Sequence, residues 1–214
     1  MERRERGPAL GFGLEDRAAR EGFSAVCGVD EAGRGPLCGP VYAGAVILPR
    51  GIVIEGLNDS KKLSEKRREQ LFSEITGKAL AYGIGSASVD EIEEINILEA
   101  ALLAMRRAVA ECSKTLEPDL LLVDGSVAKG FDIACRAVVH GDAISPSIAS
   151  ASILAKVSRD RLMIEYDALY PGHGFARHKG YGTKAHYEAI ERLGLSPIHR
   201  PSFFKHYDER HKQA

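Results

Sequence analysis

Four acidic residues follow apolar runs or adjoin glycines, and carboxylates placed in this way are candidates for holding a metal ion. Asp30 and Glu31 close the segment "AVCGVDE", Asp124 closes "DLLLVD", and Asp142 closes "AVVHGD". We expect each apolar run to be a strand, and functional sites of α/β sheets form at the carboxyl ends of strands. Clustered carboxylates repel one another unless a cation lies among them. Oxygen-only ligands favour Mg²⁺ or Mn²⁺ over zinc.

A carboxylate cluster of this size can hold two divalent ions, which is an arrangement suited to cleaving phosphodiesters. Two ions about 4 Å apart activate a water and stabilise the leaving oxygen. Each Asp-Gly pair alone is more typical of a turn, whereas three such strand ends favour a site. Successive strand residues point to opposite faces. Asp30 and Glu31 therefore reach one cluster only if the strand bends or ends there, which Gly33 permits.

The acids need a sheet to bring them together, and the hydrophobic pattern predicts one. A long helix is expected to follow Ser145, with Pro146 in its first turn. Two further helices are expected to begin at Ser88, which fits a capping box, and at Asn96. Alternating strands and helices predict a mixed α/β sheet with helices on its faces. The expected strands cover 25–30, 41–48, 79–87, 119–125 and 133–142, and the remaining helices cover 64–77 and 183–194.

Composition narrows the class of protein. The 214 residues carry a net charge of −1, 44% hydrophobic and 28% charged residues, as in a soluble globular protein. Four cysteines lack C-x-x-C spacing, and no signal peptide or membrane span is visible. We therefore expect a cytoplasmic protein with reduced thiols and no membrane partner. Residues 171–214 hold eight Lys and Arg against four Asp and Glu, an excess that suits a polyanion or a solvated tail.

Several motifs, taken together, resemble ribonuclease HII, the bacterial type 2 ribonuclease H. They are "GVDEAGRGPLCGPV", "LNDSKKLS", "LLVDG", "IASASILAKVSRDRLM", "HKGYGT" and "PIHRPSF", and the resemblance covers roughly residues 24–204. It implies an RNase H-like five-stranded sheet flanked by helices, with a C-terminal helical extension. We accordingly expect a flexible N-terminal segment at 1–22, a catalytic domain at 23–170 and an extension packed on it at 171–214.

The resemblance also implies an activity. Members cleave the RNA strand of RNA/DNA hybrids and cut 5′ of ribonucleotides embedded in duplex DNA, leaving 3′-hydroxyl and 5′-phosphate ends with two Mg²⁺ or Mn²⁺ ions. On this basis Asp30, Glu31, Asp124 and Asp142 are the catalytic metal ligands. We expect a monomer, and some family members carry a sliding-clamp peptide at the C-terminus, although none is obvious here.

The same resemblance assigns substrate contacts. Gly33, Arg34 and Gly35 would approach the ribose closely, since residues without side chains permit this, and the 2′-hydroxyl separates RNA from DNA. Tyr181 would pack on the adjoining sugar; without the resemblance an ordinary rim aromatic is favoured. The expected phosphate contacts are Lys61, Lys156, Ser158 and Arg159, with a solvated helix face as the alternative.

Two positions depart from the family pattern, and two other functions stay open. Cys38 stands where alanine is expected, and His140 replaces a lysine beside Asp142, which removes a fixed charge there. The first alternative is another Mg²⁺ nuclease of the RNase H superfamily, against which the Gly-Arg-Gly loop and "HKGYGT" argue. The second is a non-catalytic module that binds hybrids, which a missing carboxylate would favour, and all four are present.

Overall fold

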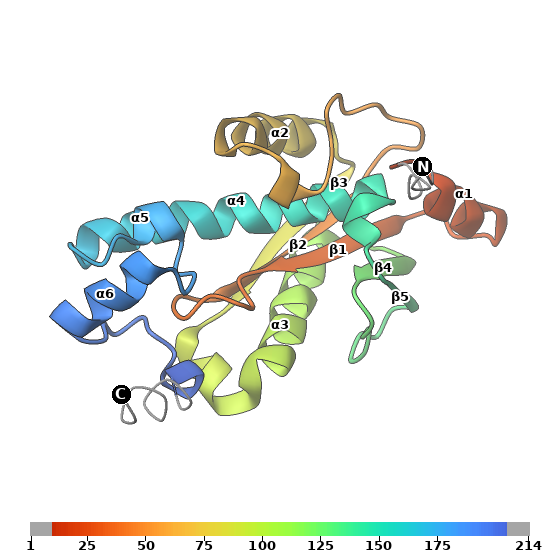
Figure 1. Cartoon of the computed structure of the whole chain (residues 1–214). Coiled ribbons are helices and arrows are strands. Elements are labelled where there is room, and N and C mark those ends of the chain that lie inside the picture. Colours follow the sequence, from red (N-terminus) through yellow and green to blue (C-terminus); the bar gives the residue numbers. More distant parts are fainter. Residues whose placement is uncertain (1–9, 205–214) are drawn as a thin grey trace, which may run out of the picture.

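One mixed sheet organises the protein, whose computed structural model describes residues 10–204. The strand order is β3-β2-β1-β4-β5 (Figure 1). The first three strands pair antiparallel, while β4 is parallel to both β1 and β5. This confirms the predicted mixed five-stranded sheet. The strands are β1 (Val26–Ala32), β2 (Val41–Ile47), β3 (Ala81–Ala87), β4 (Leu120–Asp124) and β5 (Cys135–Val138).

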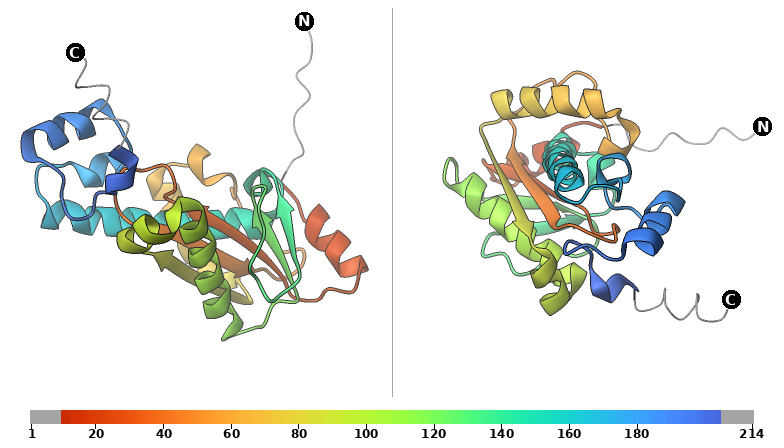
Figure 2. Two further views of the ribbon diagram at one scale, coloured as in Figure 1. Left: turned by 90° about the horizontal axis from the view of Figure 1, so that it is seen from below. Right: turned by 90° about the vertical axis from the view of Figure 1, so that its left-hand side faces the viewer.

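Helices cover both faces of the sheet. The helix α3 lies against one face, while α4 crosses the other beneath α2 (Figures 1 and 2). At the far end of α4 from α1, the chain turns back through α5 and α6, which form the C-terminal extension (Figure 1). The helices are α1 (Gly13–Arg20), α2 (Glu65–Lys78), α3 (Val89–Ser113), α4 (Pro146–Leu169), α5 (Phe175–His178) and α6 (Lys184–Leu193), with 3₁₀ turns η1 (Ser60–Lys62), η2 (Gly141–Ala143) and η3 (Pro201–Phe204).

Glycines in the sheet allow α4 to lie directly on it. A β-carbon at Gly28 would lie 2.1 Å from the carbonyl carbon of Ser147, and one at Gly44 would lie 2.3 Å from the carbonyl oxygen of Ala151. These separations are far inside van der Waals contact, so only glycine fits at either position. The close approach brings the start of α4, including Ser152, next to the middle of β1. The helix therefore helps to form the environment of Asp30.

Asn96 divides α3 into the two helices that the sequence predicts. Its backbone is non-helical, with φ 68° and ψ 164°, and its Oδ1 accepts the amide N–H groups of Leu98 at 3.0 Å and Glu99 at 3.2 Å. Ser88 forms the predicted capping box with Glu91 at the start of the first segment. Both predicted helix starts are confirmed.

Two predicted elements differ from the structure. The expectation of a flexible segment over 1–22 is wrong for 13–20, which form α1. Glu15 from α1 is buried and accepts the Ser145 hydroxyl at 2.6 Å, so the helix is fixed to the start of α4. Residues 1–9 lie outside the described residues. The predicted strand over 133–142 is also too long, because β5 ends at Val138 and His140 adopts a left-handed conformation with φ 56°.

Candidate active site

Neighbouring parallel strands bring Asp30 and Asp124 together. Val29 of β1 pairs with Val123 of β4, so the next residue on each strand is one of these two acids. Asp30 is 4% exposed. Burial raises its pKa well above the usual carboxyl range, the charges of Glu31 and Asp124 add to the effect, and a hydrogen bond with Ser152 opposes it. A cation close to Asp30 would favour the ionised form and oppose this shift.

Glu31 reaches the site from the other side of β1. The strand continues to Ala32, so the expectation that it ends at Asp30 is wrong, and alternation directs Glu31 to the opposite face. The Glu31 carboxylate accepts a hydrogen bond from the Arg34 guanidinium at 3.1 Å, and the Glu31 side chain is 15% exposed. Burial raises the pKa of Glu31, Arg34 opposes this shift, and Asp124 reinforces it. The charge of Asp124 thus raises the pKa of both Asp30 and Glu31, so the three carboxylates influence one another electrostatically.

Asp142 lies on a 3₁₀ turn rather than at a strand end, which corrects its predicted position. The left-handed backbone of His140 turns the chain out of β5, and the amide of Gly141 donates to Asp124 Oδ1 at 2.7 Å. This bond connects the turn to β4. Burial raises the pKa of the Asp142 carboxyl, and the charges of Asp124 and Asp59 add to the shift. The Lys61 ammonium lies 3.8 Å from Asp142 Oδ2 and supplies part of the missing positive charge.

The four acids suit a hard divalent cation by their chemistry. They offer only oxygen atoms, and three of them have pKa values raised by burial and mutual repulsion. Among the described residues, no three carboxylates have ligand oxygens all within 4.8 Å of one another. One Mg²⁺ ion at about 2.1 Å holds neighbouring oxygens ~3 Å apart, so the carboxylates must draw together around one ion or share two. The four acids can therefore hold a divalent metal if their side chains move closer together or bind two ions.

A pocket of about 470 Å³ extends from Glu31 past the glycine loop to Tyr181. We use the term glycine loop for residues 33–39. A β-carbon at Gly35 would lie 4.0 Å from Tyr181 Cε1 and otherwise in open space, so Gly35 presents bare backbone to the pocket. Lys156 lies over the Tyr181 ring, with Nζ 5.6 Å from its centroid. The pocket is also lined by Ser60, Lys61, Ile97, Ser152 and Phe203.

Packing against Arg159 and a positive φ angle explain why residue 33 is glycine. Its φ is 102°, and a β-carbon there would lie 2.3 Å from Nε of Arg159. A side chain at this position would therefore point into the protein, while the Gly33 backbone lines the pocket and its contact with a ribose stays a prediction. Gly35 remains the better candidate for close approach to a sugar.

The four expected phosphate contacts separate into different groups. Lys61 and Lys156 line the pocket. Ser158 is half-buried and is not part of the pocket lining. Arg159 is fully buried, and its guanidinium donates to the carbonyl oxygens of Pro40 at 3.1 Å, Lys179 at 2.9 Å and Cys38 at 2.9 Å. The expectation of a phosphate contact at Arg159 is therefore wrong; the residue supports the loop from inside.

Sequence reasoning missed several residues that hold the pocket in place. The hydroxyls of Ser60 and Ser152 form a hydrogen bond at 3.0 Å, which links η1 to α4 beside Asp30. Asp160 accepts a hydrogen bond from Lys156 Nζ at 2.7 Å, and its other oxygen lies 3.5 Å from the Arg68 guanidinium. Asp160 therefore fixes the lysine that faces Tyr181. The i,i+4 spacing of Lys156 and Asp160 could have revealed this pair. Nothing in the sequence pairs Ser60 with Ser152.

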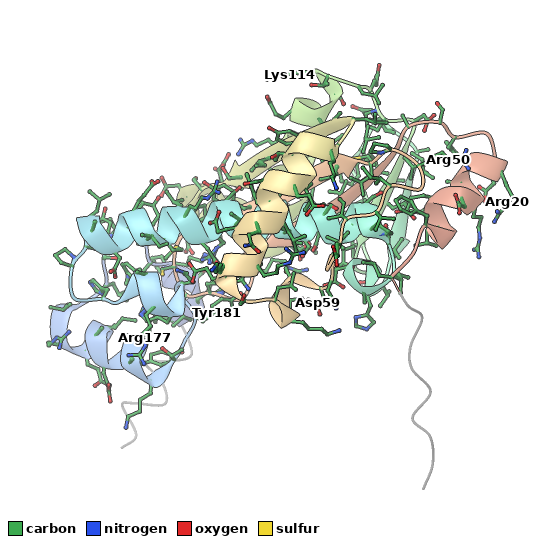
Figure 3. All side chains as sticks on the ribbon, turned by 90° about the horizontal axis from the view of Figure 1, so that it is seen from above. Arg20, Arg50, Asp59, Lys114, Arg177 and Tyr181 are labelled. Atoms are coloured by element: carbon green, nitrogen blue, oxygen red, sulfur yellow. The ribbon has the colours of Figure 1, made fainter. Side chains whose placement is uncertain are left out.

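The basic excess of the C-terminal region is only partly exposed. Lys179 is 8% exposed, and its ammonium donates to the Ala176 carbonyl at 2.6 Å. His178 Nε2 lies 2.8 Å from the His173 carbonyl oxygen. Arg177 and Lys184 remain at the surface, and Figure 3 shows Arg177 on the extension, on the same edge of the molecule as Tyr181. A phosphate-facing surface in the described part of the extension thus has fewer cations than composition suggests.

A second group of metal-type donors lies where the glycine loop meets the extension, and its two histidines are hydrogen-bonded. Ligand atoms of Cys38, His186 and His199 all lie within 4.8 Å of one another. The Ser196 amide donates to His199 Nδ1 at 2.8 Å, which assigns the proton to His199 Nε2. That nitrogen lies 3.1 Å from His186 Nε2, and His186 Nδ1 lies 3.0 Å from the Tyr181 carbonyl oxygen. Both rings therefore have partners on each nitrogen.

Comparison with known proteins agrees with this geometry. The model of the family described as Ribonuclease HII matches residues 27–206. A relative named Ribonuclease HII from Geobacter sulfurreducens is 57% identical over 92% of this chain and 89% of its own length. One of the same name from Ruminiclostridium cellulolyticum is 55% identical over 92% of this chain and 76% of its own length.

Solved structures extend the likeness to the fold. The crystal structure of the ribonuclease H2 from Pyrococcus horikoshii OT3 matches with a TM-score of 0.69 at 27% identity, over 84% of this chain and 93% of that one. The ribonuclease HII in the PCNA:RNase HII complex from Archaeoglobus fulgidus matches with a TM-score of 0.66 at 24% identity, over 83% and 94%. The family match, the relatives and the shared fold lead to one conclusion: this chain belongs to the ribonuclease HII family.

Proposed function

We propose that the chain hydrolyses the RNA strand of RNA/DNA hybrids and cuts 5′ of ribonucleotides embedded in duplex DNA, leaving 3′-hydroxyl and 5′-phosphate ends. The proposal rests on the carboxylate cluster lying next to the pocket. The carboxylate cluster at Asp30 and Asp124 is continuous, through Glu31, with a pocket where Gly35 faces Tyr181. Carboxylates suited to holding metal ions thus adjoin a surface on which a sugar can pack.

The residues Asp30, Glu31, Asp124 and Asp142 are proposed to hold two divalent ions, Mg²⁺ or Mn²⁺. Such ions, when bound, supply an activated water and stabilise the leaving oxygen. Asp30 and Asp124 hold their positions through β1 and β4, while the Gly141 amide fixes one oxygen of Asp124 at 2.7 Å. The strands and this hydrogen bond hold the two backbones in place, so only the carboxylate side chains need to move when metal ions bind.

The choice of a ribonucleotide is proposed to come from the pocket rather than from the carboxylates. Gly35 offers backbone without a side chain, which allows a ribose 2′-hydroxyl to come within hydrogen-bonding reach. Tyr181 is 44% exposed and faces that backbone, so its ring can pack on the adjoining sugar. Lys156 lies over the ring, and Lys61, which lines the pocket and pairs with Asp142, is a candidate phosphate contact.

The proposed organisation keeps the catalytic domain at 23–170 and the extension at 171–214, with Tyr181 supplied by the extension. We place the enzyme in the cytoplasm as a monomer, where all four cysteines would stay as the free thiols seen here. Among the described residues, no helix has the length and apolar character to cross a membrane. A sliding-clamp contact stays a prediction, and residues 206–214, where the C-terminal peptide would lie, are outside the described residues.

One assay tests this function. Duplex DNA with a single ribonucleotide, labelled at either end, is incubated with the protein in Mg²⁺, Mn²⁺ or EDTA, and an all-DNA duplex is the control. We expect metal-dependent cleavage on the 5′ side of the ribonucleotide with a 3′-hydroxyl end. Cleavage in EDTA, or a 2′,3′-cyclic phosphate product, would contradict the proposed mechanism.

A further inference from the structure

Arg200 uses its whole guanidinium to hold the glycine loop. It is 0% exposed, and it donates to the carbonyl oxygens of Gly33 at 2.7 Å, Pro36 at 2.8 Å, Arg34 at 3.2 Å and Gly39 at 2.6 and 2.8 Å. A guanidinium has five N–H donors in a rigid fork, and five donor contacts are made here. The loop therefore wraps around one cation.

The chemistry of this contact is unusual for a buried charge. Within the described residues no carboxylate forms an ion pair with Arg200, and all its acceptors are backbone carbonyls of the glycine loop. Burial lowers the pKa of Arg200 to about 9, with repulsion from Arg159 adding to the effect, so the group stays charged at neutral pH. A buried charge is costly unless its hydrogen bonds are satisfied. The carbonyls are thus held in a fixed arrangement by the need to solvate the cation.

The residues beside Arg200 connect the same loop to Tyr181. The Arg200 amide donates to the Leu37 carbonyl at 2.9 Å, and the Gly39 amide donates to the Ile198 carbonyl at 2.8 Å. Leu37 in turn donates its amide to the Gly180 carbonyl at 2.8 Å, next to Tyr181. His199 holds His186, whose Nδ1 faces the Tyr181 carbonyl oxygen at 3.0 Å. Residues 198–200 therefore fix both sides of the pocket at once.

We propose that Arg200 is a positioning residue for ribonucleotide recognition: it sets the placement of the Gly35 backbone relative to Tyr181. The inference rests on the proposed function, because it concerns how that site reads a ribose. Arg200 does not reach the substrate itself, since it is buried behind the loop. Its effect acts through the loop backbone, and misplacement of a positioning group by about 1 Å costs roughly 100-fold in rate.

The test uses Arg200→Lys and Arg200→Gln in the full chain, with Arg192→Lys as the matched control. Arg192 belongs to the same extension but donates from its exposed side chain to the Gly172 carbonyl at 3.0 Å, away from the pocket. Lysine keeps the charge but has three donors on one atom and cannot reproduce the fork. Three quantities are measured well below each melting temperature: kcat/KM at a single embedded ribonucleotide, the Kd for an all-DNA duplex, and Mn²⁺ affinity by calorimetry.

The expected result is a fall of about 100-fold in kcat/KM for both Arg200 variants, with DNA and Mn²⁺ affinities within about threefold of wild type. Arg192→Lys should match wild type in all three. An unchanged kcat/KM per folded molecule, even with a lower melting temperature, would overturn the proposal by showing a purely structural role. Failure of both Arg200 variants to fold would overturn it too, because the bonds would then support the whole protein. A wild-type chain that does not cleave would instead refute the proposed function.

Discussion

Lys61 lies 3.8 Å from Asp142, from Nζ to Oδ2, and so pairs with the carboxylate cluster at Asp142 as Arg34 does at Glu31. Burial works against its charge, yet Asp142, Asp30 and Asp124 raise the pKa of Lys61. The lysine side chain is 81% exposed and so can move away without unpacking the protein. We therefore expect a divalent ion held by these carboxylates to displace the Lys61 ammonium.

This pairing predicts that Lys61 competes with metal. Lys61→Gln should bind Mn²⁺ about two- to fivefold more tightly without substrate, because a screened surface charge contributes only ~0.2–1 kcal/mol. Lys62→Gln is the matched control, since Lys62 faces Asp59 at 3.7 Å rather than Asp142. Calorimetric titration of both variants measures the effect. Unchanged or weaker Mn²⁺ binding in Lys61→Gln alone would refute the competition.

The raised pKa of Asp30 predicts a gain in stability when its charge is removed. Burial, with the charges of Glu31 and Asp124, favours the protonated form in the folded protein. The folded state then binds a proton that the unfolded chain releases, so the free energy of unfolding falls as pH rises above about 4. Without metal at pH 7.5, Asp30→Asn should be more stable by about 0.5 to 2 kcal/mol.

Urea unfolding at pH 7.5 and near pH 4 measures this difference. The gain should shrink as the pH falls toward 4, where the unfolded carboxyl is itself partly protonated. Saturating Mn²⁺ should reverse the order, because the wild type gains a ligand and the variant does not. A metal-free Asp30→Asn that is less stable than wild type at pH 7.5 would show that the carboxylate is satisfied in the folded protein.

We expect the loss of the Tyr181 ring to reduce cleavage of one substrate class more than the other. Tyr181→Ala should reduce kcat/KM at a single embedded ribonucleotide by about tenfold, or ~1.4 kcal/mol, and affect a long RNA/DNA hybrid less. The reason is that the variant removes packing on the adjoining deoxyribose while leaving the carboxylates in place. Tyr181→Phe keeps the ring and should resemble wild type. Equal losses on both substrates would mean that Tyr181 supports general binding or structure.

The two glycines can be separated in the same assay. Gly35→Ala places a methyl group in open pocket space, so it should lower cleavage of every ribonucleotide substrate without a change in melting temperature. Gly33→Ala should instead lower stability, because its φ is 102° and the methyl group would meet Arg159. A destabilised Gly35→Ala would show that the loop has less room than the structure indicates.

Sequence patterns predicted the elements whose local signals are strong. The capping residues Ser88 and Asn96 marked helix starts correctly, even where Asn96 interrupts one long helix. The end of β5 was missed because a left-handed residue is usually glycine or asparagine, and here it is His140. Asp142 consequently has the predicted neighbours but stands on a turn.

The main error in the site concerns buried arginines. Arg159 was expected to contact a phosphate, and the sequence suggested no role for Arg200. In the structure, their hydrogen bonds go to backbone carbonyls, and all but that of Lys179 lie more than a hundred residues away in the chain. Carbonyl acceptors have no sequence signature, so neither local propensity nor charge patterning could reveal this role. The carboxylates were easier to find because adjacent strand ends converge by topology.

The most direct test of the catalytic assignment is the single-turnover cleavage rate of Asp124→Asn on a duplex with one ribonucleotide in Mg²⁺. Asparagine keeps the size of the side chain and an oxygen that can accept the Gly141 amide, while it removes the negative charge. We expect cleavage at least about 1,000-fold slower than wild type, with substrate Kd within about threefold, because the transition state loses charge-based stabilisation. A rate within tenfold of wild type would contradict a carboxylate-held metal site at this position.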